Sequence, residues 1–212
     1  MVDNLSTEIY KLSKRKKGGL IMENETAKSQ AKGKKKLTTP DMAYVGIFAA
    51  IIAVCSWISI PLTIPVTLQT MAVCITAGLL GTKRGTLTVF VYILIGLVGV
   101  PVFSNFSAGV GQLMGPTGGY LIGFIFTALI VGAATELLGD KIWVYVVSMI
   151  VGIAVLYAFG TAWFVIVYNR GNADAVTVSG ALSMCVVPFI IPDLIKVSLA
   201  AFFCRALKKH IK

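Results

Sequence analysis

The chain has 212 residues, of which 57% are hydrophobic and 13% are charged, and its formal net charge is +10. Soluble domains carry about 25% charged residues, so this composition excludes an ordinary soluble domain. The positive charge does not indicate nucleic-acid binding, because ten of the 19 Lys and Arg residues lie in the first 36 positions and four more lie in the last eight. Basic tails that flank apolar segments are typical of membrane proteins, so the expected partner is a lipid bilayer.

Residues 1–40 are rich in Lys, Ser and Thr and poor in aromatic residues. Such a composition does not bury a core, and we predict a basic, disordered cytoplasmic tail. The run from Lys16 to Met22 has the amino acids that a purine-rich ribosome-binding site followed by a start codon would encode. We therefore hypothesise that the natural chain starts at Met22.

Residues 41–212 are predicted to form an all-α integral membrane domain with six spans. Long stretches of this region carry no charged residue, and a spanning helix needs about 20 mostly apolar residues. Breaks at Pro61, Gly81 and Pro101 divide the apolar sequence. The six predicted spans are about 42–60, 67–80, 85–100, 119–138, 142–168 and 187–207.

The basic residues between the spans predict the orientation. With six spans, both tails, Lys83-Arg84 and Lys141 fall on one side, and the other side receives Arg170. The positive-inside rule then places both termini in the cytoplasm. The outward loops, at about 60–66, 101–118 and 169–186, are partly apolar and rich in Gly or Pro. Such backbone is tolerated near a bilayer when it is buried in protein or lines a cavity, so these loops predict a covered pocket.

Asp193 and Lys196 are the only charged residues between Ala175 and Phe203, and their spacing places them on one helical face. Ionisable groups inside a span are costly and indicate a functional site. A carboxylate accepts hydrogen bonds from ligand N–H groups, and an ammonium donates to a ligand carbonyl or carboxylate. The alternative is a structural ion pair near the start of the helix, after Pro192.

Three further features have both a binding and a structural interpretation. The glycine-rich run 109–120 lacks the Lys-Ser/Thr ending of a phosphate-binding loop, and it forms either a tight turn or a close approach to a ligand. Gln69 and Thr67 offer hydrogen bonds to an amide-like ligand or to a neighbouring helix. In the first span, Ala49 and Ala53 have the spacing of small residues at helix contacts, within the chain or with another subunit.

The sequence contains no catalytic or metal-binding motif and no ATP-binding motif. The four cysteines have apolar neighbours and no CxxC spacing, so we interpret them as core residues. His210 has no second histidine to complete a metal site. We predict that the protein is not an enzyme, holds no cofactor, and depends on a partner or an ion gradient if it moves a ligand actively.

Several separated segments, in order, resemble the BioY family, the biotin-specific S-components of energy-coupling factor (ECF) transporters. These segments are Pro61–Thr70, Gly78–Gly81 with Arg84-Gly85, Gly99–Phe103, Gly115–Tyr120, and Asp193 with Lys196. The resemblance covers about residues 42–207. It implies a six-helix bundle in the bacterial plasma membrane, high-affinity biotin capture beneath the outward loops, and pairing with a T-component and two ATPases that use ATP.

The resemblance also implies roles for individual residues. The pair Asp193 and Lys196 matches the family's biotin-contacting Asp-x-x-Lys, and Ala49 and Ala53 match small residues that contact the T-component. The family usually has Pro-Gly before this Asp, whereas Ile191-Pro192 precedes Asp193 here. The full set of predicted substrate-binding residues is Asp193, Lys196, Gln69, Thr67, Gly115, Thr117, Gly118, Tyr120 and Asn105. The alternatives are an S-component for another small vitamin and a small membrane enzyme acting on lipids.

Overall fold

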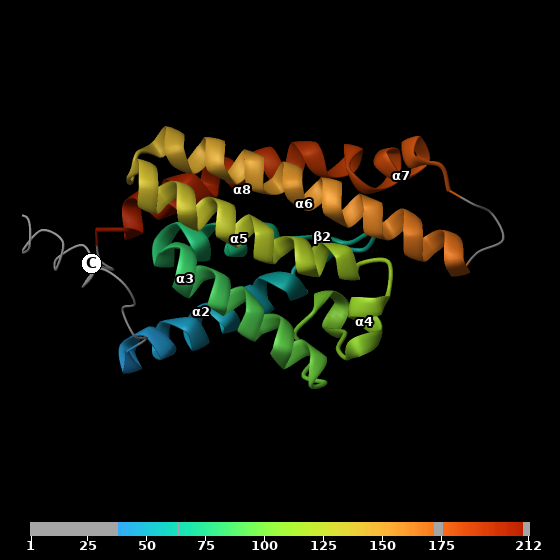
Figure 1. Cartoon of the computed structure of the whole chain (residues 1–212), viewed down its shortest axis with the longest axis horizontal. Helices are drawn as coiled ribbons and strands as arrows, with labels where there is room; N and C mark the ends of the chain where they lie inside the picture. The colour runs from blue at the N-terminus through green and yellow to red at the C-terminus, as the bar shows by residue number, and fades with distance from the viewer. Residues whose placement is uncertain (1–37, 63, 172–175, 210–212) are drawn as a thin grey trace, which may run out of the picture. The chain divides into compact units, whose positions relative to one another are not determined.

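A computed structural model describes residues 38–62, 64–171 and 176–209. The proposed start at Met22 and most of the predicted tail lie outside these residues. The elements in chain order are the helices and strands α2 (Thr39–Trp57), β1 (Ser59–Ile60), β2 (Val66–Thr67), α3 (Gln69–Leu97), η1 (Ser104–Phe106), α4 (Val110–Met114), α5 (Gly118–Leu138), α6 (Ile142–Gly171), α7 (Val178–Cys185) and α8 (Val187–Leu207) (Figure 1). The first helix begins inside the predicted tail, because Pro40 is compatible with the first turn of a helix.

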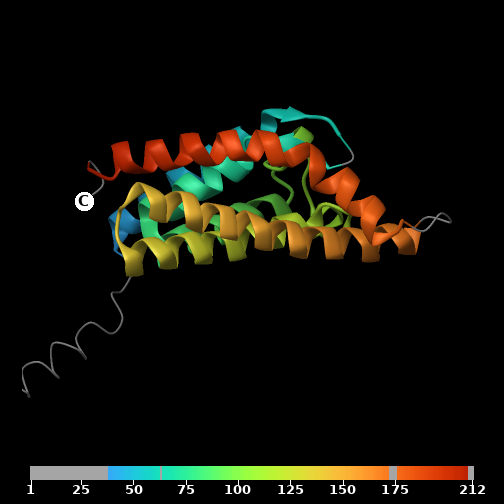
Figure 2. The same ribbon diagram turned by 90° about the horizontal axis from the view of Figure 1, so that it is seen from above.

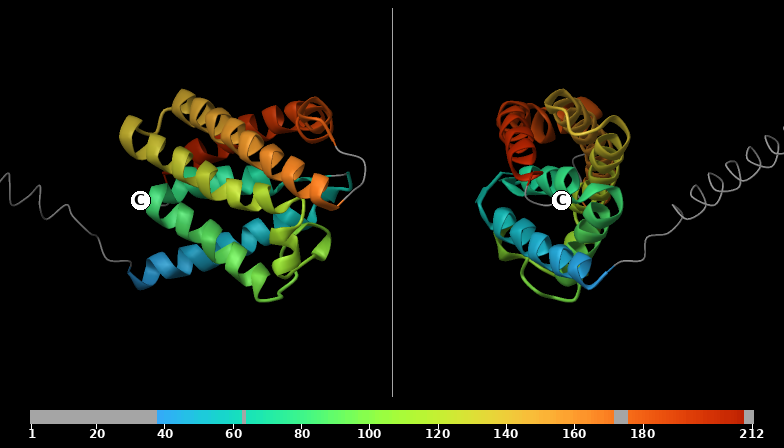
Figure 3. Two further views of the ribbon diagram at one scale, coloured as in Figure 1. Left: turned by 45° about the vertical axis from the view of Figure 1, so that its right-hand side comes forward. Right: turned by 90° about the vertical axis from the view of Figure 1, so that its left-hand side faces the viewer.

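Five helices in the described part of the chain are long and apolar enough to cross a membrane: α2, α3, α5, α6 and α8. The prediction of a helical membrane domain is therefore confirmed, whereas the count of six spans is a separate question. Helices α5 and α6 lie side by side, α3 packs against α5, and α8 contacts both α3 and α6 (Figures 2 and 3). Helix α2 lies at the edge of the bundle beside α3.

Helix α3 folds back on itself at Gly81, and its two arms correspond to the predicted spans 67–80 and 85–100. Gly81 has φ 77° and ψ −173°, a conformation that glycine adopts without the steric cost of a Cβ atom. A Cβ atom on Gly85 would lie 2.9 Å from Cα of Ala77. In a straight helix these residues would be about 12 Å apart along the axis. The arms therefore run back past each other (Figure 1).

Side chains from α5 and from the residue after α8 satisfy backbone groups that this turn leaves without intrahelical partners. Glu136 of α5 accepts hydrogen bonds from the backbone N–H of Thr82 at 2.9 Å and from its hydroxyl at 2.8 Å. Lys208, just after α8, donates to the carbonyl oxygens of Gly78 and Leu79 at 3.0 and 3.1 Å. The turn in α3 is thus held by α5 and by the end of α8.

The connections predicted as outward loops gather at the opposite end of the bundle, on the right of Figure 1. They contain short elements that the sequence analysis did not predict. Strands β1 and β2 pair antiparallel, with Ser59 opposite Thr67 and Ile60 opposite Val66. The second loop contains η1 and α4, and the third contains α7. These elements cover the bundle where α3 and α5 begin.

Candidate ligand-binding site

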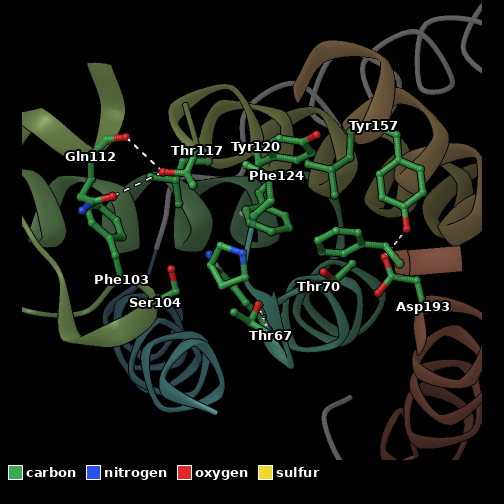
Figure 4. Close-up of a pocket in the computed structure, with 16 residues that line it drawn as sticks. Thr67, Thr70, Phe103, Ser104, Gln112, Thr117, Tyr120, Phe124, Tyr157 and Asp193 are labelled. Carbon is green, nitrogen blue, oxygen red and sulfur yellow. Dashed lines mark hydrogen bonds between the residues drawn. The ribbon is translucent and has the colours of Figure 1, made fainter. Parts of the chain in front are cut away.

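A cavity lies beneath these loops, between α3, α5, α6 and α8 (Figure 4). Its wall combines polar side chains from the loops and helix starts with aromatic and aliphatic side chains from the helices. The lining residues are Ile64, Pro65, Thr67, Gln69, Thr70, Phe103, Ser104, Gln112, Thr117, Tyr120, Leu121, Phe124, Leu156, Tyr157, Phe189 and Asp193. The predicted residues Asp193, Gln69, Thr67, Thr117 and Tyr120 are among them.

Asp193 forms one polar end of the cavity. Its side chain is buried, and its Oδ1 atom lies 2.7 Å from Nζ of the buried Lys196. The hydroxyl of Tyr157 donates to Oδ2 at 2.6 Å (Figure 4). Lys196 is not among the lining residues, so it neutralises and orients the carboxylate from behind the wall. The tyrosine partner was not predicted, because nothing in the sequence links position 157 to position 193.

Gln69 brings an unsatisfied amide to the same cavity. It is the first residue of α3, is only 4% exposed, and follows Thr67, whose hydroxyl accepts the Gln69 backbone N–H at 3.2 Å. The side-chain Nε2 atom has no hydrogen-bond partner among the described residues. A buried amide without a partner costs free energy, and native proteins rarely keep one without a reason. A ligand acceptor in the cavity would satisfy it.

The second polar end is formed by Ser104, Gln112 and Thr117, as Figure 4 shows. The Thr117 hydroxyl lies 3.3 Å from Oε1 of Gln112, which joins the start of α5 to the short helix α4. None of these three side chains carries a formal charge. The cavity therefore has a carboxylate at one end, neutral hydrogen-bonding groups at the other, and rings between them.

Four of the predicted binding residues lie outside the lining set, and each of them contacts neighbouring parts of the chain. They are Lys196, Gly115, Gly118 and Asn105. The carbonyl of Gly115 accepts a hydrogen bond from the indole of Trp163 at 3.1 Å. Gly118 packs so closely on Leu113 that a Cβ atom would collide with the Leu113 carbonyl oxygen. Asn105 has φ 56° and accepts a hydrogen bond from Ser59 at 3.0 Å, which ties η1 to β1.

The aromatic wall is what the sequence analysis missed most completely. Phe103, Phe124, Tyr157 and Phe189 line the cavity. Tyr120 was predicted, and its hydroxyl lies 3.1 Å from that of Thr161. Aromatic residues at helical spacing are also what a hydrophobic core requires, so no local pattern distinguishes the two roles.

The first helix carries the small residues that were predicted to contact a partner subunit or another part of the chain. Ala49 and Ala53 are buried in the core of the chain, at 3% and 6% exposed, so neither presents a free surface to a partner. The other pair with the same spacing, Gly46 and Ala50, is exposed on α2. Both faces of α2 carry small residues, and their spacing does not show which face is covered.

A membrane-spanning helical bundle that encloses a mixed polar and aromatic cavity belongs to the class of membrane proteins that bind a small molecule. The chain belongs to the BioY family, which it matches over residues 27–212. This is a family of transporter subunits rather than enzymes, so the prediction of a non-enzymatic, multi-pass membrane protein is confirmed.

Individual relatives agree with this assignment. The chain is 45% identical over 165 residues to the biotin transporter BioY of Thermotoga maritima, covering 77% of this chain and 93% of the relative. It is 33% identical over 169 residues to the probable biotin transporter BioY of Pyrococcus horikoshii, covering 79% and 96%. A crystal structure of the S-component for biotin from an ECF-type ABC transporter superposes with a TM-score of 0.74 at 26% identity, covering 82% and 96%.

Proposed function

We propose that this protein is the biotin-binding S-component of an ECF transporter and captures biotin in the cavity beneath the loops. The observation that carries the proposal is that a buried, unpartnered Gln69 amide and the Asp193 carboxylate both line this cavity. Together they supply a buried donor and a buried acceptor to the same cavity. The family assignment narrows the substrate to biotin.

The polar groups suit the two ends of biotin. Its ureido ring carries two N–H donors and a carbonyl, and its valerate chain ends in a carboxylate. Asp193 accepts from the ureido N–H groups, and the Gln69 amide donates to an acceptor on the ligand. A second carboxylate beside Asp193 would be repelled, so the valerate carboxylate lies at the neutral end, near Gln112 and Thr117. The ring-lined middle of the cavity holds the apolar part of the ligand.

We further infer six membrane crossings with both termini in the cytoplasm. The two arms of α3 on either side of Gly81 support a count of six, since they run in opposite directions. Four basic residues lie at the end of the bundle away from the loops: Lys83, Arg84, Lys141 and Arg205. Arg170 lies at the loop end. Under the positive-inside rule this distribution makes the cavity face outward.

Titration calorimetry on detergent-purified protein tests the substrate directly, with thiamine and riboflavin as controls. Growth and purification without biotin are essential, because bound biotin would mask the site. We expect selective, one-to-one binding of biotin. If folded, ligand-free protein binds a different vitamin instead, the ligand assignment is wrong. If it binds no small vitamin, the proposal of a vitamin-binding subunit fails.

Tyr157→Phe is expected to weaken biotin binding about two- to tenfold. The substitution removes the hydroxyl that orients Asp193, and one hydrogen bond contributes about 0.5–1.5 kcal/mol. Tyr145→Phe is the matched control, because Tyr145 also lies on α6 and also donates to an aspartate, Asp140, at 3.0 Å, but outside the cavity. Calorimetry should show weaker biotin binding for Tyr157→Phe and wild-type affinity for Tyr145→Phe. Equal affinities would remove Tyr157 from the site.

The same proposal includes a T-component and two ATPases, and α2 is the helix best placed to meet the T-component. It lies at the edge of the bundle, and Gly46 and Ala50 make its outer face shallow enough for close helix contact. Nothing lies within 4 Å of a Cβ atom placed on Gly46, so a larger side chain there does not disturb the chain itself.

Gly46→Leu is therefore expected to reduce co-purification with the T-component at least tenfold while biotin affinity stays unchanged. Ala162→Leu, at an exposed small residue of α6, provides the control. The comparison is made after co-expression of all four transporter subunits, by affinity capture of the T-component. Retention of the Gly46→Leu chain at the wild-type level would move the interface away from this face of α2.

A further inference from the structure

A second, positively charged groove lies at the end of the bundle away from the biotin cavity. It has a volume of about 510 Å³ and is lined by Asp140, Lys141, Ile142, Trp143, Arg205, Lys208 and Lys209. We call it the basic groove. Its volume falls within the range of about 300–1,000 Å³ for small-molecule sites. Four cations and one carboxylate surround it, so its charge favours an anion.

The cations of the groove divide into a structural member and three free ones. Lys208 donates to the carbonyls of Gly78 and Leu79 and lies 3.6 Å from Asp140. Asp140 also accepts a hydrogen bond from Tyr145 at 3.0 Å. Lys141, Arg205 and Lys209 are exposed and form no ion pair with any residue in the described part of the chain. Their charge is available to a ligand.

The position of the groove identifies the kind of anion. It lies where the apolar helices α5 and α8 end, at Leu138 and Leu207, and where α6 begins at Ile142. The ends of membrane-spanning helices lie at the level of the lipid headgroups. Trp143, which is 54% exposed, belongs to the residue type that concentrates at this level.

The groove also has an apolar side, which distinguishes a lipid from a soluble anion. Ile142 and Trp143 line it beside the lysines, and Ile142 is 41% exposed. A free phosphate or a soluble organic anion gains no binding energy from this apolar side of the groove. A phospholipid places its phosphate among the cations and its first acyl carbons against Ile142 and the indole.

We propose that the basic groove is a binding site for the headgroup of an anionic phospholipid, such as phosphatidylglycerol. Arginine offers planar, forked hydrogen bonding to phosphate oxygens, so Arg205 makes the principal contact, and Lys141 and Lys209 add charge. The site is independent of the proposed biotin cavity. Because Lys208 links the groove to the turn in α3, a bound headgroup also stabilises the end of α8 against that turn.

Native mass spectrometry of the full chain in detergent tests this site, with phosphatidylglycerol or phosphatidylcholine carrying the same acyl chains. We expect one phosphatidylglycerol to be retained at a lipid concentration at least tenfold lower than phosphatidylcholine requires. Arg205→Gln should remove most of this preference, and the charge-conserving Arg205→Lys should keep part of it. Equal retention of the two lipids by the wild-type protein would overturn the proposal.

Lys83→Gln is the matched control, because Lys83 is an exposed cation at the same end of the molecule that does not line the groove. It should keep the preference in full. An equal loss in Lys83→Gln and Arg205→Gln would mean that diffuse surface charge attracts the lipid, and the groove would not be a site.

Glycerol phosphate, the soluble headgroup analogue, distinguishes a lipid from a free phosphate. It should fail to displace the lipid at equal concentration, and displacement would reassign the groove to a soluble phosphate. Thermal unfolding of each variant without added lipid verifies that it is folded. If Arg205→Gln is unfolded, Lys209→Gln replaces it in the same comparison.

Discussion

Asp193→Asn is expected to weaken biotin binding about tenfold or more. The substitution keeps the size of the side chain but replaces an acceptor oxygen with an N–H donor, which then faces the donor N–H groups of the ureido ring. Hydrogen bonds to charged groups contribute about 1.5–3 kcal/mol, and about 1.4 kcal/mol corresponds to a factor of ten in affinity. Titration calorimetry with biotin measures the change, and unchanged affinity would exclude Asp193 from the site.

Asp193→Ala should do more than remove a ligand contact. It leaves the Lys196 ammonium, 6% exposed, without the carboxylate that lies 2.7 Å away in the wild-type chain. Breaking a buried ion pair by deleting one member typically destabilises a protein by about 3–5 kcal/mol. The Ala variant is thus expected to lose thermal stability as well as affinity. The Asn variant also loses the negative charge but keeps a side-chain oxygen that accepts from Lys196, so its loss of stability should be smaller than that of the Ala variant.

A double-mutant cycle separates the roles of the two charged residues. If Lys196 acts only through Asp193, Lys196→Met should weaken binding in the wild-type background and have little further effect in the Asp193→Asn background. Independent losses that add would show that Lys196 contacts biotin itself. Asp140→Asn, which removes a carboxylate far from the cavity wall, is the control for loss of charge and should leave biotin affinity unchanged.

Gly118→Ala is the second substitution with a large expected effect, a loss of biotin affinity of about tenfold or more. The added methyl group would collide with the carbonyl oxygen of Leu113 and lie 3.0 Å from its Cα atom. Backbone cannot move aside as a flexible side chain does, so the segment between α4 and α5 must shift. That segment positions Gln112 and Thr117 at the neutral end of the cavity.

Gly111→Ala is the matched control for this loop. Gly111 lies in α4, only seven positions earlier, and nothing lies within 4 Å of a Cβ atom placed on it. The biotin affinity of the Gly111→Ala variant should stay within about twofold of wild type, because alanine is more favourable than glycine inside a helix. Similar affinities for the Gly118 and Gly111 variants, with both proteins folded, would show that the shape of the loop does not set the affinity.

The sequence by itself determined the class of the protein, most helix ranges and the key polar residues. Uncharged apolar stretches are a local property, and the bilayer requires each of them to form a complete helix, so α5, α6 and α8 begin within one residue of their predicted starts. Asp193 and Gln69 were found because polar groups are rare in such helices. The resemblance to the BioY family also rests on local segments in order.

Only the tertiary structure decided which faces of these helices meet. In a soluble protein the polar face of a helix marks the side that faces water. Here both the lipid and the core are apolar, so polarity does not show that Ala49 and Ala53 are buried whereas Gly46 and Ala50 are exposed. For the same reason Phe124, Tyr157 and Phe189 could not be assigned to the cavity. The Tyr157–Asp193 hydrogen bond and the Glu136 and Lys208 contacts at the turn of α3 join residues 36 to 130 positions apart. Such pairs arise from packing, which no local pattern encodes.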